Sequence, residues 1–207
     1  MKVKTILNIG VASTFAIVVG TVSMIALRGS PTRASSVELR VYGSVPEFAL
    51  TEAKGTALRR EDLLGKVWIA SFIFTRCGDA CPTMMRHETR LQAQLPLRDD
   101  LRLVSFSVDP DWDTPKVLTD YAHTFGVDRS RWMFLTGDKK QVYQLATEGF
   151  RLATLEADPA KEMPILHSTK LVLVDRHGAI RGYYDSTEET ELQNLVRDVR
   201  QVLAERS

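Results

Sequence analysis

The strongest early strand signal in the sequence is residues 67–74, a mostly apolar run that ends just before the first cysteine, Cys77. A nearly continuous apolar run of this length predicts a central strand that is covered on both faces. The segment from Cys81 to about Leu95 predicts a helix, because Pro82 suits the first helical turn and apolar residues recur at helical spacing. Cys81 is therefore expected at the N-terminus of a helix.

Strands and helices are predicted to alternate through much of the remaining chain. Residues 101–108 predict a second strand, and a helix is expected at 115–125 after several aspartates and prolines break the chain. Residues 170–174 and 179–184 are typical of two antiparallel strands joined by a tight turn at 175–178.

The C-terminal segment predicts an amphipathic helix. Ser186 with Glu189 indicates a capping box at its start. Apolar residues then recur at helical spacing, at Leu192, Leu195, Val196, Val199, Val202 and Leu203. Such a helix would cover one face of the sheet. The whole pattern predicts an α/β fold in which a central mixed sheet is flanked by helices on both sides.

The first residues of the chain form a separate apolar segment. No charged residue occurs between Thr5 and Leu27, and a run of this length can cross a bilayer as a helix. A cleaved signal peptide is the alternative, but its apolar centre usually has only about 7–15 residues. We therefore expect an uncleaved N-terminal transmembrane helix within a membrane anchor at 1–28, a small polar linker at 29–36 and one domain at 37–207.

Charged residues indicate how the chain is oriented in the membrane, and they argue against a nucleic-acid partner. Lys2 and Lys4 predict a cytoplasmic N-terminus, although Arg28 and Arg33 reduce the asymmetry across the apolar segment. The domain is then expected on the outer side of an inner (cytoplasmic) membrane, facing the periplasm or the cell exterior. Without these four residues, 23 basic residues remain against 26 acidic ones, a net charge of −3. This balance offers no basic surface for phosphates, so no nucleic-acid partner is expected.

The two cysteines, Cys77 and Cys81, carry the most specific chemistry in the sequence. A loop after a strand and the N-terminus of a helix both present positive backbone dipoles, which favour thiolate over thiol, so both sulfurs are expected to be reactive. Three intervening residues permit a structural disulfide, a redox dithiol or two ligands to one ion. The spacing alone does not choose among these alternatives.

A metal site would need a further ligand, and the chain has four histidines. His167 is the only one directly before a predicted core strand, although a hydrogen-bonded loop histidine is the alternative role. His87, His123 and His177 fall on a helix, in a charged helical stretch and in a turn, and we assign none of them to a metal. Two thiolates with an imidazole suit monovalent copper, while zinc is possible if a fourth ligand joins.

Several short motifs, taken in order, resemble the Sco/SenC proteins, thioredoxin-fold copper proteins of cytochrome oxidase assembly. The resemblance covers nearly the whole predicted domain. The CxxxCP segment alone is a weak signal, but its combination with the other segments is specific. The segments are Val45-Pro-Glu-Phe-Ala-Leu50, Phe74-Thr-Arg-Cys-Gly-Asp-Ala-Cys-Pro-Thr83, Ser107-Val-Asp-Pro110, Asp113-Thr-Pro115, Leu135-Thr-Gly137 and His167-Ser168.

The resemblance implies a thioredoxin-like fold in which Cys77 and Cys81 are copper thiolates and also the redox dithiol. It implies that His167 is the third copper ligand. Family members often have proline where this chain has Gly78, while the following acid, Asp79, is retained. The loop is therefore expected to be more flexible, with Asp79 either capping the helix or hydrogen-bonding near the site.

Two functions are consistent with these residues. The first is a copper metallochaperone that passes the ion to the dinuclear copper site of a cytochrome c oxidase subunit. The alternative is a thiol-disulfide reductase that reduces the cysteines of that copper site, and it leaves open whether the chain is an enzyme. Other copper chaperones or thiol-disulfide proteins are expected partners in either case. A peroxiredoxin-like peroxidase is disfavoured, because Thr75 lies two rather than three residues before Cys77.

Overall fold

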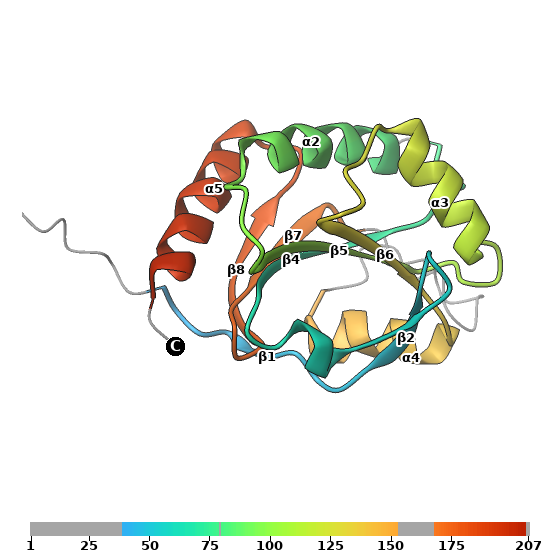
Figure 1. Ribbon diagram of the computed structural model, residues 1–207, viewed down its shortest axis with the longest axis horizontal. Helices are drawn as coiled ribbons and strands as arrows, with labels where there is room; N and C mark the ends of the chain where they lie inside the picture. Colours follow the sequence, from blue (N-terminus) through green and yellow to red (C-terminus); the bar gives the residue numbers. More distant parts are fainter. Residues whose placement is uncertain (1–38, 79, 153–167, 206–207) are drawn as a thin grey trace, which may run out of the picture. The chain divides into compact units, whose positions relative to one another are not determined.

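The computed structural model describes residues 39–78, 80–152 and 168–205. The strands in these ranges form one sheet in the order β1-β8-β7-β4-β5-β6-β2-β3 (Figure 1). At its centre, β4 (Val67–Ile73) runs parallel to β5 (Leu101–Ser107) and antiparallel to β7 (Lys170–Val174). The sheet is therefore mixed, as the sequence predicts.

The outer strands extend the sheet in both directions. Beyond β5 lie β6 (Trp132–Thr136), β2 (Ala49–Glu52) and β3 (Ala57–Arg59). Beyond β7 lie β8 (Ala179–Asp185) and the short β1 (Gly43–Ser44). Strands β7 and β8 form the predicted antiparallel hairpin, with a bulge near its turn.

Helices lie on both faces of the sheet (Figure 1). One face is covered by α2 (Ala80–Gln94), α3 (Pro115–Thr124) and α5 (Glu189–Ala204). On the other face lies α4 (Lys139–Gln144), which continues into a π-helical turn at Leu145–Gly149. The expected arrangement of a central sheet between helices is confirmed.

Two hydrophobic cores fill the space between these layers. Alternate side chains of a strand point to opposite faces, so Val67 and Ile69 of β4 pack with α2, α3 and α5. Trp68 and Phe72 of the same strand pack with α4 and the π-helical turn. Every residue of β4 is buried, which confirms the prediction of a strand covered on both faces.

The six predicted strand and helix segments between residues 67 and 185 agree with the structure to within one residue at each end. The expected capping box is wrong, because α5 begins at Glu189 with Glu188 as its N-cap. Ser186 is buried, and its hydroxyl has no partner among the described residues. The predicted anchor 1–28 and linker 29–36 lie outside the described residues. Within the described ranges, no helix combines the length and the apolar character that a membrane crossing requires.

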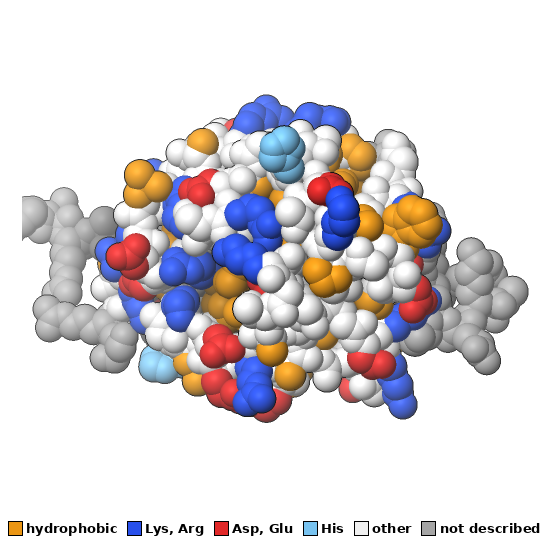
Figure 2. Space-filling view, turned by 45° about the vertical axis from the view of Figure 1, so that its right-hand side comes forward, with side chains coloured by type: hydrophobic (Ala, Val, Ile, Leu, Met, Phe, Trp, Pro, Cys, Tyr) orange, Lys and Arg blue, Asp and Glu red, His pale blue; other side chains and the backbone are white. Residues whose placement is uncertain are grey.

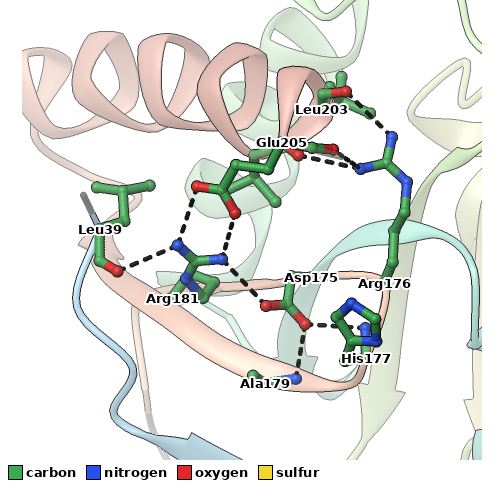
Figure 3. Close-up of polar contacts among 9 residues, drawn as sticks. Leu39, Asp175, Arg176, His177, Ala179, Arg181, Leu203 and Glu205 are labelled. Carbon is green, nitrogen blue, oxygen red and sulfur yellow. Dashed lines mark hydrogen bonds and ion pairs between the residues drawn. The ribbon is translucent and has the colours of Figure 1, made fainter. Parts of the chain in front are cut away.

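A buried arginine ties the end of α5 to the β7–β8 hairpin (Figure 3). Arg181, whose side chain is 7 % exposed, donates from Nη1 to a carboxylate oxygen of Asp175 (3.1 Å). Its two terminal nitrogens also donate to the carboxylate of Glu205 (2.6 and 3.0 Å), and Nη2 donates to the carbonyl oxygen of Leu39 (3.1 Å). Beside it, Arg176 donates to carbonyl oxygens of the last turn of α5. These contacts connect the first described residues, the hairpin and the last helix.

We predict that Arg181→Met lowers the free energy of unfolding by about 3 kcal/mol, because it leaves two carboxylates close together without their shared cation. The control is Lys116→Met, since Lys116 lies 2.6 Å from Asp120 and both side chains are exposed (83 % and 64 %). Its loss is expected to be below about 1 kcal/mol. Urea unfolding of both variants measures the two values, and equal losses would contradict the role given to burial.

Candidate metal centre

The cysteine loop connects β4 to α2 and holds both sulfurs at one end of the sheet. The backbone N–H of Cys77 donates to the carbonyl oxygen of Phe74 (3.2 Å), which closes a turn just after the strand. The backbone N–H of Cys81 donates to Sγ of Cys77 (3.3 Å), so this sulfur lies against the first turn of α2. In the described structure no disulfide joins the two cysteines; Cys77 is half-buried and Cys81 is 6 % exposed. The structure therefore brings the two predicted sulfur ligands to the same short loop.

Two aspartates that follow β5 brace the cysteine loop. The buried carboxylate of Asp113 accepts hydrogen bonds from the backbone N–H of Thr75 (3.2 Å) and from the hydroxyls of Thr75 and Ser107 (both 2.5 Å). Asp109, 5 % exposed, accepts from Nε and Nη2 of Arg76 (2.9 and 2.6 Å). The two residues directly before the first cysteine are thus fixed to the loop of the neighbouring strand. The sequence motifs name these aspartates, but their contact with the cysteine loop is visible only in the fold.

Burial, rather than the helix dipole, decides the protonation of Cys81. Desolvation, with smaller contributions from Cys77 and Glu88 in the same direction, raises the pKa of the Cys81 thiol to about 12. The expectation that backbone dipoles make both sulfurs thiolates is therefore wrong for Cys81. Its thiol must release a proton before the sulfur can bind a cation or attack a disulfide.

A buried carboxyl group lies two turns further along α2. Glu88 is 1 % exposed, and its Oε2 accepts from the hydroxyl of Ser71 in β4 (3.0 Å). The hydroxyls of Ser71 and Ser105 are hydrogen-bonded (2.8 Å), and Nε1 of Trp132 donates to Ser105 (2.8 Å). Among the described residues Oε1 of Glu88 has no partner, and burial raises the pKa of Glu88 to about 8. A glutamate inside an apolar helical stripe, seven residues after Cys81, is the signal that could have predicted this buried acid.

The third predicted ligand, His167, lies outside the described residues. The strand that follows it is described, and β7 pairs antiparallel with β4, with Val172 opposite Ala70. The N-terminal end of β7 therefore lies beside the end of β4 that leads into the cysteine loop. The described chain that follows His167 therefore begins at this edge of the sheet.

Of the other three histidines, one is hydrogen-bonded to the backbone and two are exposed. Nδ1 of His87 is hydrogen-bonded to the carbonyl oxygen of Ser186 (2.6 Å), which ties α2 to the chain before α5. His123 in α3 and His177 in the β7–β8 turn are exposed. In the part of the chain that the structure describes, no three His, Cys, Asp or Glu side chains gather into a group able to hold a metal ion.

The family comparison agrees with the motifs and with the fold. Residues 40–204 match the family model described as SCO1/SenC. The chain belongs to the SCO1/SenC family. The SCO1 protein homolog of Bacillus subtilis is 34 % identical over 158 residues, which cover 75 % of this chain and 81 % of that protein. The resemblance to the copper proteins of cytochrome c oxidase assembly is thereby confirmed.

Solved structures of Sco proteins share the fold described above. BsSco, a member of the Sco family of cytochrome c oxidase assembly proteins in which a disulfide switch was identified, is 29 % identical, with a TM-score of 0.70. The match covers 82 % of this chain and 99 % of that chain. Bradyrhizobium japonicum ScoI, solved with copper bound, has a TM-score of 0.62 and 23 % identity, and the match covers 77 % of this chain and 99 % of that chain. At that identity the second likeness establishes the fold alone.

We predict that Glu88→Gln removes a pH dependence of stability. Burial raises the pKa of Glu88 from 4.5 to about 8 in the folded state, so the folded protein keeps a proton that the unfolded chain releases. Stability from this proton is complete below pH 4.5 and falls as the pH rises to about 8. Glutamine still accepts the hydrogen bond from Ser71 but does not ionise. The unfolding free energy of the wild type should therefore fall relative to Glu88→Gln across this window.

The measurement is urea unfolding under reducing conditions at several pH values between about 5 and 8. Glu148→Gln is the matched control, because Glu148 is exposed and lies on the opposite face of the sheet. The free energy of unfolding of this control should change with pH in the same way as that of the wild type. The same pH dependence in Glu88→Gln as well would show that the Glu88 carboxyl does not hold the proton.

Proposed function

We propose that this SCO1/SenC protein carries one monovalent copper ion on Cys77, Cys81 and His167 and helps to load the dinuclear copper site of cytochrome c oxidase. The observation that carries the proposal is the cysteine loop itself. Two thiols lie within one helical turn, at the edge of the sheet where the segment ending at His167 rejoins the described chain. A Stutzerimonas stutzeri relative that is named as a copper-binding protein, 32 % identical to this chain over 166 residues, supports the choice of metal.

The donor set fits a soft ion that must also be released. Two sulfurs and one ring nitrogen suit monovalent copper, and a site with few ligands allows another protein's ligands to replace them one at a time. Because Cys81 is a thiol without metal, copper uptake releases its proton, so binding weakens as the pH falls. We also propose that an anchor at 1–28 and a linker at 29–36 keep the domain 37–207 at the outer side of the inner (cytoplasmic) membrane, next to its acceptor.

Thiol–disulfide exchange is a second candidate, favoured by the hydrogen bond from the Cys81 N–H to Sγ of Cys77, which stabilises a thiolate on Cys77. The Cys77 thiolate would attack a partner's disulfide, forming a mixed disulfide and releasing one partner thiolate. After Cys81 loses its proton, its sulfur would attack Cys77 Sγ and release the second partner thiolate. The partner is then reduced, and this chain holds a Cys77–Cys81 disulfide.

Anaerobic titration of the reduced full chain with monovalent copper tests the ligand assignment. We expect one ion per wild-type chain, with sulfur-to-copper charge-transfer absorption. Cys77→Ser and Cys81→Ser should lose this absorption, and His167→Ala should bind at least about tenfold more weakly. The control is His123→Ala, because His123 is exposed on α3 and is expected to leave the affinity unchanged.

Oxidase assembly in cells separates the two candidate functions. A carrier needs its third ligand, so His167→Ala should reduce assembly together with copper affinity. A reductase needs only the two thiols, so His167→Ala should then leave assembly intact. Full affinity and full assembly in His167→Ala would remove His167 from the site and favour exchange.

A further inference from the structure

An exposed arginine and tryptophan form a ledge beside the cysteine loop. The guanidinium carbon of Arg76 lies 4.7 Å from the centre of the Trp112 ring, and Arg76 directly precedes Cys77 in the chain. Trp112 is 51 % exposed, and the side chain of Arg76 is 52 % exposed. We call these two side chains the Arg76–Trp112 ledge. A stacked guanidinium and indole attract each other through the cation and the ring face.

The ledge is held in place before any partner arrives. Arg76 donates two hydrogen bonds to the buried carboxylate of Asp109. The backbone N–H groups of Trp112 and Asp113 both donate to the carbonyl oxygen of Asp109 (3.0 and 2.9 Å). The carboxylate of Asp113 in turn holds Thr75. Surfaces that are already ordered lose little conformational freedom when they are covered.

A single exposed apolar side chain usually needs no explanation. Hydrophobic and charged side chains are interspersed on the face in Figure 2, and Leu97 is 83 % exposed in the loop before β5. Trp112 differs from Leu97 in its location. Parallel strands β4 and β5 place Trp112 at the same sheet edge as the cysteine loop, whereas Leu97 lies near the strands' opposite ends. Trp112 is thus exposed at the edge of the sheet where the chemistry occurs.

Any protein that exchanges a ligand with Cys77 must bring its own sulfur into contact with this half-buried thiol, and its surface then covers the neighbouring residues. Arginine and tryptophan are the residues most enriched at energetically dominant interface positions. In the described part of the chain, Nε and Nη2 of Arg76 donate to Asp109, and Nη1 has no acceptor. This nitrogen can donate to a carboxylate of the partner.

We propose that the Arg76–Trp112 ledge is the docking surface for the copper-receiving protein, a domain that presents its own copper-site thiols with an apolar side chain and a carboxylate beside them. The ledge serves protein partners alone, because a small ligand reaches Cys77 without covering Trp112. The proposal rests on the proposed copper-transfer function and adds the surface that selects the partner.

The test measures copper transfer from the loaded full chain, in detergent, to the reduced, metal-free soluble copper domain of the oxidase subunit. Trp112→Ala should slow this transfer by about 10- to 30-fold, the loss expected for an interface residue of this class. Its copper affinity and the rate at which a small-molecule chelator removes the ion should stay within about twofold of the wild type. Leu97→Ala, the matched exposed control, should equal the wild type in all three measurements.

Tryptophan fluorescence gives an independent readout. The sequence has three tryptophans, and Trp68 and Trp132 are 1 % and 0 % exposed, so quenching by acrylamide reports mainly on Trp112. The difference in quenching between wild-type and Trp112→Ala samples gives the contribution of Trp112. Adding the oxidase domain should protect Trp112 from acrylamide.

Each contrary result has a distinct meaning. Transfer by Trp112→Ala at the wild-type rate, or transfer without protection of Trp112, would overturn the ledge as the docking surface. Slower removal by the small chelator in Trp112→Ala would also overturn it, because the residue would then act on the copper site itself. A wild-type protein that binds copper but passes none to the domain would overturn the proposed function, and the ledge with it.

Discussion

The antiparallel pairing of β7 with β4 is the constraint on which the site depends. It places the start of β7 beside the end of β4, although the two strands are about a hundred residues apart in sequence. The parallel pairing of β4 with β5 brings the loop of Asp109 and Asp113 to the same edge. Three chain segments therefore meet at one place because of strand direction alone, and the buried core on both faces of β4 keeps these directions fixed.

Burial favours the protonated form of two acidic groups on α2. Without metal, burial keeps Cys81 as a thiol, and a second buried acid, Glu88, follows on the same helix. Among the described residues, no Lys or Arg forms an ion pair with Glu88, so its negative charge would be unbalanced. The hydrogen bonds from Trp132 through Ser105 and Ser71 point toward this carboxyl and connect α2 to three strands. The helix that carries Cys81 is thereby fixed to the sheet by polar as well as apolar contacts.

Hydrophobic periodicity predicted the parts of the fold whose side chains have a single clear environment. The buried β4, the amphipathic α2 and α5 and the β7–β8 hairpin are of this kind. The sequence pattern did not predict β6, or α4 with its π-helical turn. The six residues of α4 are too few for a helical stripe to stand out. Gly126 does separate β6 from the preceding helix, but the apolar run of β6 is only four residues long, which is too short to distinguish a strand from a buried helical turn.

The chemistry of the site could be predicted only where it depends on spacing. The cysteine motif gave the positions of the two sulfurs, but the protonation of Cys81 depends on burial, which no spacing reports. Ser186 was predicted as a cap because its local motif fits one, but tertiary packing buries it instead. The contact of Arg76 with Asp109 and Trp112 joins two loops and therefore depends on the register of β4 and β5.

The proposed copper site needs two sulfurs and one imidazole nitrogen at the same ion. X-ray absorption at the copper edge, on the full chain loaded with one equivalent of monovalent copper, measures these neighbours. We expect two sulfur neighbours and one nitrogen neighbour, with the nitrogen signal lost in His167→Ala. A copper environment with sulfur alone, or a nitrogen signal that persists unchanged in His167→Ala, would contradict the proposed site.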